Sequence, residues 1–166
     1  MGKFVKGESV FPIVQNEFTA TGLVFNENGQ ILMVKHKKQG KWLPPGGHVD
    51  ENELPCKAVA REVMEETGIS VQVLSSTPML DLSKAGKELP LPLRIIFCDV
   101  EGTGRHNHID LLYLCRAVNV DIVPQEAETD GIGWFSPEEA MRLDTYEDIA
   151  KSIEAALELM KSLDLF

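Results

Sequence analysis

Apolar and polar positions follow two different periods along this chain. Phe18 to Phe25 and Ile31 to His36 are rich in β-branched and aromatic residues, so we expect two β-strands there. The Asn28-Gly29 pair between them supplies the positive φ of a tight hairpin turn. The pattern therefore predicts a hairpin, followed by a Pro- and Gly-rich loop from Leu43 to Gly47.

A helical period replaces the strand pattern from Leu54 to Thr67. Pro55 suits the first turn of a helix, and Gly68 suits the left-handed residue that ends one. Apolar side chains recur at i, i+3, i+4 and i+7, at Cys56, Val59, Ala60 and Val63. We expect this helix to bury that stripe.

The rest of the chain alternates further strands and helices. A capping box with proline at the first helical position begins at Ser136, and an amphipathic helix is predicted over Tyr146 to Leu163. Its inward positions are Ile149, Ile153, Ala156, Leu157 and Met160. Four more strands are expected, at Ser70 to Val73, Arg94 to Val100, Ile109 to Ala117 and Gly133 to Phe135, with loops at Lys84 to Pro92 and Glu101 to His106.

This order of elements predicts an α/β fold in which a mixed sheet is packed by helices on its faces. No repeat or linker divides the sequence, so residues 1–166 are expected to form one domain. No apolar run approaches the roughly 18 residues of a membrane span, and no signal-peptide pattern follows Met1. We therefore expect a soluble, cytoplasmic protein with no membrane partner.

Cysteine usage and charge narrow the function classes. Cys56, Cys98 and Cys115 lack CxxC spacing and lie among apolar neighbours, which indicates buried thiols. The net charge of −10 argues against a nucleic-acid partner, whose binding requires an excess of Lys and Arg. A small polyphosphate remains a candidate ligand if divalent cations neutralise it.

Three carboxylates share one edge of the predicted helix. Glu62, Glu65 and Glu66 are spaced at i, i+3 and i+4, and their mutual repulsion costs the helix a few tenths of a kcal/mol per pair. Because the available ligands are all oxygen, Mg²⁺ or Mn²⁺ is the natural counterion. A solvated acidic helix face is the alternative.

The segment before the helix favours a metal site over a solvated acidic helix face. In Pro44-Pro45-Gly46-Gly47 two prolines stiffen the approach, and two glycines let the backbone come close to a ligand. The Gly46 carbonyl is a further candidate metal ligand. Arg61 can bond a neighbouring carboxylate, with Glu53 as the candidate partner.

The stretch Gly47 to Ile69 resembles the complete Nudix box, Gly-x5-Glu-x7-Arg-Glu-U-x-Glu-Glu-x-Gly-U, where U is aliphatic. Gly47, Glu53, Arg61-Glu62, Glu65-Glu66 and Gly68 occupy its fixed positions. The resemblance extends more loosely to the hairpin, the Trp42 to Gly47 entry and Trp134-Phe135. It implies a Nudix-type α/β/α sandwich and metal-dependent hydrolysis of a phosphoanhydride bond in a nucleoside diphosphate derivative.

The resemblance also implies roles within the box. Glu62 and Glu66 are the first metal ligands, and Glu65 is a further ligand or the base that acts on water. Arg61 and Glu53 orient loop against helix. Because Nudix enzymes differ in where they place the general base, Glu126 and Glu128 are distal candidates.

Residues that recognise the substrate are less clearly marked. Lys35, Lys41, Arg94 and His108 are candidates for substrate binding, and three more basic residues could reach phosphate, namely Lys37, Lys38 and Arg105. The His106-x-His108 pair resembles two metal ligands, but the sequence places no third imidazole or thiolate beside it. We therefore expect Mg²⁺ or Mn²⁺ rather than zinc.

Three alternatives remain open at this stage: an isoprenoid diphosphate isomerase, a Nudix-like module that senses nucleotides without cutting them, and an interaction protein with a structural acidic helix. The region Ser83 to Glu88 carries neither the Pro nor the Tyr that marks ADP-ribose and diadenosine polyphosphate subgroups. A nucleoside di- or triphosphate or a nucleoside diphosphate derivative is thus the expected small-molecule substrate. The nucleotide, the phosphorus attacked, the number of metal ions and the formation of a homodimer stay open.

Overall fold

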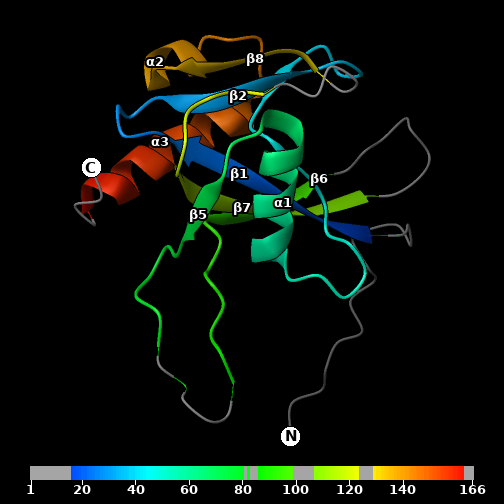
Figure 1. Ribbon diagram of the computed structural model, residues 1–166, viewed down its shortest axis with the longest axis vertical. Helices are drawn as coiled ribbons and strands as arrows, with labels where there is room; N and C mark the ends of the chain where they lie inside the picture. Colours follow the sequence, from blue (N-terminus) through cyan, green and yellow to red (C-terminus); the bar gives the residue numbers. More distant parts are fainter. Residues whose placement is uncertain (1–15, 81, 83–85, 99–106, 124–128, 163–166) are drawn as a thin grey trace, which may run out of the picture.

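A mixed β-sheet forms the centre of the computed structural model, which describes residues 16–80, 82, 86–98, 107–123 and 129–162 (Figure 1). The strands are β1 (Asn16–Phe25), β2 (Ile31–His36), β3 (Trp42–Leu43), β4 (Gly46–His48), β5 (Val71–Leu74), β6 (Arg94–Cys98), β7 (Asn107–Ala117) and β8 (Thr129–Phe135). The helices are α1 (Pro55–Thr67), α2 (Pro137–Ala140) and α3 (Glu147–Ser162).

The long parallel pair of β1 and β7 runs through the middle of the sheet. Its register extends from Asn16 opposite Asn107 to Phe25 opposite Arg116. On its other side β1 pairs antiparallel with β4 and, at its end, with β2. β7 pairs antiparallel with β5 and β6, and β2 pairs with β3 and β8. One parallel pair among antiparallel neighbours makes the sheet mixed, as predicted.

Alternating side chains of the central strands fill two separate cores. Ala20 and Val24 of β1 point to the same face as Tyr113 and Cys115 of β7, and α1 covers that face. The intervening residues of both strands point to the opposite face, which α3 covers with Ile153, Ala156 and Met160. Figure 1 shows the sheet running between α1 and α3. The predicted α/β/α sandwich is confirmed.

Local chemistry fixes where α1 begins and ends. Leu54 has an extended backbone and Pro55 opens the first turn, where its missing N–H costs no hydrogen bond. Gly68 has φ 73°, a left-handed conformation that ends the helix, and its N–H donates to the Met64 carbonyl. The boundaries match the prediction, so the three glutamates lie in the last two turns.

Three short or extended strands differ from the prediction. The segment Leu43 to Gly47 was expected to be a loop, but Gly46–His48 forms the short strand β4, because β1 offers it open backbone groups. β3 likewise pairs with β2. β8 is longer than predicted, since it pairs with β2 beyond the apolar stretch Gly133 to Phe135. The predicted loop Glu101 to His106 and the end of the predicted strand at Val100 lie outside the described residues.

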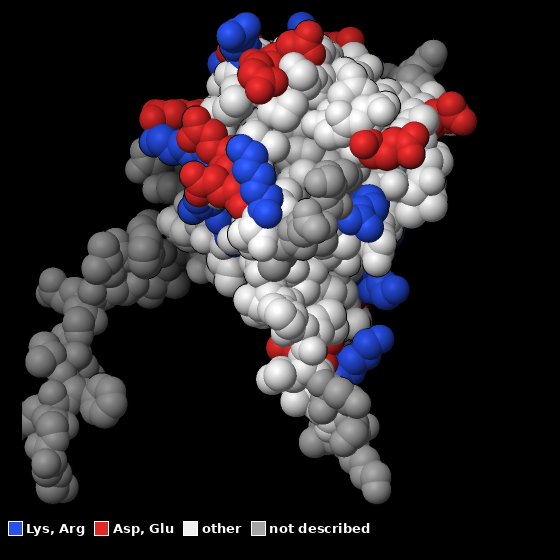
Figure 2. All heavy atoms as spheres, turned by 90° about the vertical axis from the view of Figure 1, so that its left-hand side faces the viewer, with Lys and Arg blue, Asp and Glu red and all other residues white. Residues whose placement is uncertain are grey.

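The second half of the chain confirms the predicted helix signals. Ser136 accepts from the Glu139 N–H while the Glu139 carboxylate accepts from the Ser136 N–H, so the capping box is complete. Three of the expected inward positions of α3, Ile153, Ala156 and Met160, are buried in the core, and the other two, Ile149 and Leu157, are partly buried and pack against it. The face in Figure 2 places acidic and basic side chains beside one another.

The structure confirms free, buried thiols for two of the three cysteines. Cys56 and Cys115 are buried, Cys98 is half-buried, and none of the three forms a disulfide. Burial raises the pKa of the Cys115 thiol to about 12, so this group stays protonated and packs as an apolar side chain. Among the described residues no helix is both long and apolar enough to span a membrane.

Truncating the α3 core contact tests the packing of this layer. Ile153→Ala removes a fully buried side chain, and we expect it to lower the free energy of unfolding by about 2 to 5 kcal/mol. Ile95→Ala is the matched control, because Ile95 is 67% exposed and should change the free energy by no more than about 0.5 kcal/mol. Urea denaturation of both variants measures the difference, and equal losses would contradict the assigned core.

Candidate active site

β4 brings two glycines against the carboxylate edge of α1. β4 is held by β1 through Thr19 to Thr21, while α1 packs on the same strand. A Cβ placed on Gly47 would lie 2.5 Å from Cδ of Glu62, closer than real Cβ atoms come to any neighbour. The Gly46 N–H donates to Glu66 Oε2 at 3.2 Å. Glycine at this position therefore leaves room for the Glu62 carboxylate to lie against the backbone.

Arg61 is the hub of the ion pairs on this edge. Its guanidinium donates to both oxygens of Glu53, at 3.0 and 2.9 Å, which is the two-pronged geometry that favours arginine. It also donates to Glu62 Oε1 at 2.8 Å and to Glu65 Oε2 at 3.1 Å. A fifth bond, of 3.0 Å, reaches the His48 carbonyl at the end of β4. One side chain thus ties the glycine strand, the following loop and the helix together.

Burial and charge shift the pKa values of this cluster in opposite directions. Hydrogen bonding to Arg61 holds the pKa of the Glu53 carboxyl below its usual range. Desolvation raises the pKa of Glu62, although Arg61 opposes the change. The Glu62 side chain is only 17% exposed, whereas that of Glu65 is 52% exposed. A cation that faced Glu62 would therefore stabilise a charge that the protein alone solvates poorly.

Helix position adds to the excess of negative charge. The three glutamates approach the C-terminal end of α1, where the helix dipole is also negative, and its last turn holds no basic residue. Arg61 contacts Glu53, Glu62 and Glu65, so one guanidinium faces three carboxylates. Around Arg61 the carboxylates therefore outnumber the single positive charge.

These residues fit a divalent cation in their chemistry. The donor set is made of carboxylate oxygens beside a glycine backbone, which suits Mg²⁺ or Mn²⁺ and offers no soft ligand for zinc. Within the part of the chain that the structure describes, no three acidic, His or Cys side chains already converge as a metal cage. Glu62 and Glu65 instead hold Arg61, and a bound cation would compete with it for them.

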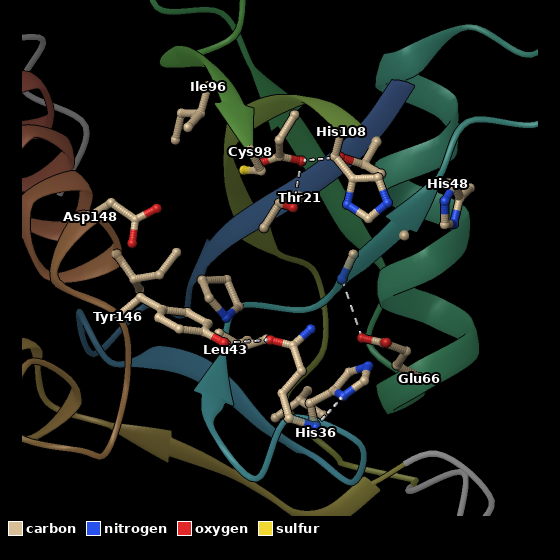
Figure 3. Close-up of a pocket in the computed structure, with 18 residues that line it drawn as sticks. Thr21, His36, Leu43, His48, Glu66, Ile96, Cys98, His108, Tyr146 and Asp148 are labelled. Atoms are coloured by element: carbon tan, nitrogen blue, oxygen red, sulfur yellow. Dashed lines mark hydrogen bonds between the residues drawn. The ribbon is translucent and has the colours of Figure 1, made fainter. Parts of the chain in front are cut away.

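A cavity of about 300 Å³ opens beside this cluster (Figure 3). Gly46, Gly47 and Glu66 form one side of it. Figure 3 shows Asp148 and Tyr146 on the opposite side, with Ile96 and Cys98 of β6 between them and His108. The cavity is thus a place for a ligand that also touches the box.

Asp110 is a carboxyl group of β7 that lines the same cavity. It accepts from the hydroxyls of Thr19 and Thr21, both at 2.8 Å and both onto Oδ1. Desolvation raises its pKa, while the two threonines act against that change. Asp110 was not among the predicted site residues, although a charged side chain inside the apolar run Ile109 to Ala117 was a visible signal.

Of the predicted substrate-binding residues that the structure describes, one lies at the cavity. His108 lines it. Lys41 forms an ion pair with Asp144, Lys35 lies in β2 opposite Trp42, and Arg94 is exposed on β6. The distal candidates Glu126 and Glu128 lie outside the described residues, as do Arg105 and His106.

The chain matches known proteins over most of its length. A family model described as the NUDIX domain matches residues 16–156. A probable DHNTP pyrophosphohydrolase of Lactococcus lactis subsp. cremoris is 30% identical over 140 residues, covering 80% of this chain and 74% of that protein. An RNA pyrophosphohydrolase of Actinobacillus succinogenes is 30% identical over 118 residues, covering 69% and 58%.

A solved structure agrees with these matches. The crystal structure of a NUDIX-family hydrolase from Clostridium perfringens superposes with a TM-score of 0.72 at 30% identity. The aligned part covers 86% of this chain and 97% of that one. The similarity therefore extends well beyond the box.

A methyl group on the glycine strand tests the close approach to Glu62. Gly47→Ala places its Cβ 2.5 Å from the carboxyl carbon, so we expect the carboxylate to move and hydrolytic turnover to fall about 100-fold. Gly86→Ala is the matched control, since nothing lies within 4 Å of its added Cβ. Steady-state assays of the two folded variants make the comparison, and full activity in Gly47→Ala would contradict this geometry.

The Glu53 to Arg61 pair predicts a pH-dependent stability. Because the pKa of folded Glu53 lies below the ordinary carboxyl value, its contribution is complete above that value and is lost as pH falls through the lowered one. We expect Glu53→Gln to cost about 1 to 2 kcal/mol at pH 7 and progressively less below pH ~4.5. Denaturation curves from pH 7 downward measure this difference, and a pH-independent loss would refute it.

Proposed function

This chain belongs to the Nudix hydrolase family, and on that basis we propose that it hydrolyses a phosphoanhydride bond in a nucleoside di- or triphosphate or a nucleoside diphosphate derivative. The observation that carries the proposal is the Glu62 and Glu66 pair held against Gly46 and Gly47. An anionic polyphosphate can approach such a site only with cations between the two.

Mg²⁺ or Mn²⁺ is the proposed cofactor, with Glu62 and Glu66 as its first ligands and with Glu65 and the Gly46 carbonyl as further ones. A bound divalent cation would neutralise phosphate oxygens and make water more acidic. Family membership supports this dependence, as does the excess of carboxylates over the one guanidinium that contacts them.

The chain's own residues would divide the remaining work. Arg61 and Glu53 are positioning residues, because their two-pronged pair fixes the loop before α1 relative to the helix. Glu65 is the most exposed carboxylate of the cluster and is the box candidate for the base that takes a proton from water. Positioning and electrostatics supply most of the acceleration in phosphoryl transfer.

The alternatives predict different measurements. A sensing module would bind nucleotides without turnover, and an isomerase would convert isoprenoid diphosphates without releasing phosphate. Two relatives are named for pyrophosphohydrolase activity, which supports hydrolysis between phosphates and the release of pyrophosphate. A panel of nucleotides, nucleotide sugars and isoprenoid diphosphates with Mg²⁺ or Mn²⁺, its products separated by chromatography, distinguishes the three.

Neutralising the two first ligands tests the site itself. We expect Glu62→Gln and Glu66→Gln each to lower kcat/KM on the best substrate of that panel by about 100-fold or more, since even residues that only support metal ligands cost about 10- to 100-fold. Glu138→Gln is the control, because Glu138 is an exposed acid on α2, away from the cluster. Unchanged turnover in both ligand variants would remove the catalytic assignment.

A further inference from the structure

The cavity beside the box is chemically different from a phosphate site. Asp110 and Asp148 both line it, and among the described residues no lysine or arginine does. The charge of Asp148 reaches Asp110, where it adds to the effect of burial. A phosphate group entering here would meet like charge, and none of the described lining residues is a lysine or arginine that could neutralise it. The group that fits this cavity carries hydrogen-bond donors instead.

Asp110 is built to accept hydrogen bonds from such a group. The Thr19 and Thr21 hydroxyls both donate to Oδ1, which uses its two lone pairs and fixes the orientation of the carboxyl group. The described residues give Oδ2 no hydrogen bond. Because Asp110 lines the cavity, this second oxygen is available to a ligand. A polar acceptor in a mostly apolar pocket is the usual way in which a pocket selects its ligand.

The walls of the cavity suit a flat ring. Leu43, Ile96 and Ile149 line it, and Tyr146 stands on the side toward α3 (Figure 3). The Tyr146 hydroxyl donates to Gln39 Oε1 at 3.2 Å, which restrains the ring. Apolar and aromatic walls accommodate the faces of a nucleobase, while its edge requires polar partners.

We propose that this cavity holds the base of the nucleotide substrate and that Asp110, supported by Asp148, selects a base whose edge carries an amino group. The inference rests on the proposed function, because it takes the phosphates to lie at the glutamate cluster. Glu66 and Gly46 border both places, so one ligand can span them. A base edge that offers only acceptors would place an acceptor against Oδ2 of Asp110 and give that oxygen no donor, which disfavours such a base.

Matched substrates that differ in one amino group test this selection. The pairs are GTP with ITP, ATP with purine riboside triphosphate, and CTP with UTP. For the preferred base we expect kcat/KM at least about tenfold higher with the amino group than without it. Asp110→Asn should bring the two members of that pair to within about threefold, because an amide gives the base a donor beside its acceptor.

Asp121→Asn is the control, since Asp121 is exposed and does not line the cavity. It should keep the wild-type preference. A wild type that prefers the member without the amino group, or an Asp110→Asn variant that keeps the full preference, overturns the proposal. If thermal unfolding shows that Asp110→Asn does not fold, Asp148→Asn takes its place in the test, because Asp148 is exposed. Asp148→Asn should lower the preference for the amino group at least about threefold, and an unchanged preference would again overturn the proposal.

Binding without chemistry separates this inference from the proposed function. Calorimetric titration of wild type and Asp110→Asn with the matched monophosphates, GMP with IMP and CMP with UMP, requires no turnover. If wild type hydrolysed no nucleotide but bound the amino member more tightly, and only Asp110→Asn lost that preference, the proposed function would fail and base selection would stand. Hydrolysis without any preference in binding or turnover would sink the inference alone.

Discussion

The Arg61 guanidinium connects the three segments on which the proposed site depends. It binds both oxygens of Glu53 in the loop, the His48 carbonyl at the end of β4, and two carboxylates of α1. Without a cation among them, the three carboxylates would repel one another and the carbonyl oxygen. Since arginine stays protonated at any ordinary pH, a change of pH does not remove its charge from these contacts. It organises the helix edge and leaves Glu66 to the glycine backbone.

β1 links this edge to the neighbouring cavity. Thr19 to Thr21 pair on one side with the glycines of β4, and on the other side the same stretch pairs with β7 around Asp110. The side chains of Thr19 and Thr21 hold the Asp110 carboxyl, while their backbones hold the strand that meets Glu62 and Glu66. A single short stretch therefore sets the distance between the place proposed for phosphates and the place proposed for the base.

Much of this could be predicted from the sequence because it depends on local rules. The ends of α1 follow from Pro55 and Gly68, the capping box from Ser136 and Glu139, and the box itself from fixed spacing. The pairing of β1 with β7 joins residues about ninety positions apart, which no local pattern encodes. For the same reason the cavity could not be predicted. Asp110 and Asp148 come to line one cavity only when α3 packs on the sheet that contains β7. The basic candidates Lys35, Lys41 and Arg94 were chosen by charge alone, and none of these three lines the cavity.

The central claim is that the glutamate edge of α1 binds a divalent cation for hydrolysis between phosphates. Anomalous diffraction from crystals soaked in Mn²⁺ tests it most directly, because it locates the ion without relying on turnover. The account predicts a peak in contact with carboxylate oxygens of both Glu62 and Glu66, and no such peak in the Glu66→Gln protein. A fully occupied Mn²⁺ site elsewhere, with none between these two residues, would contradict it.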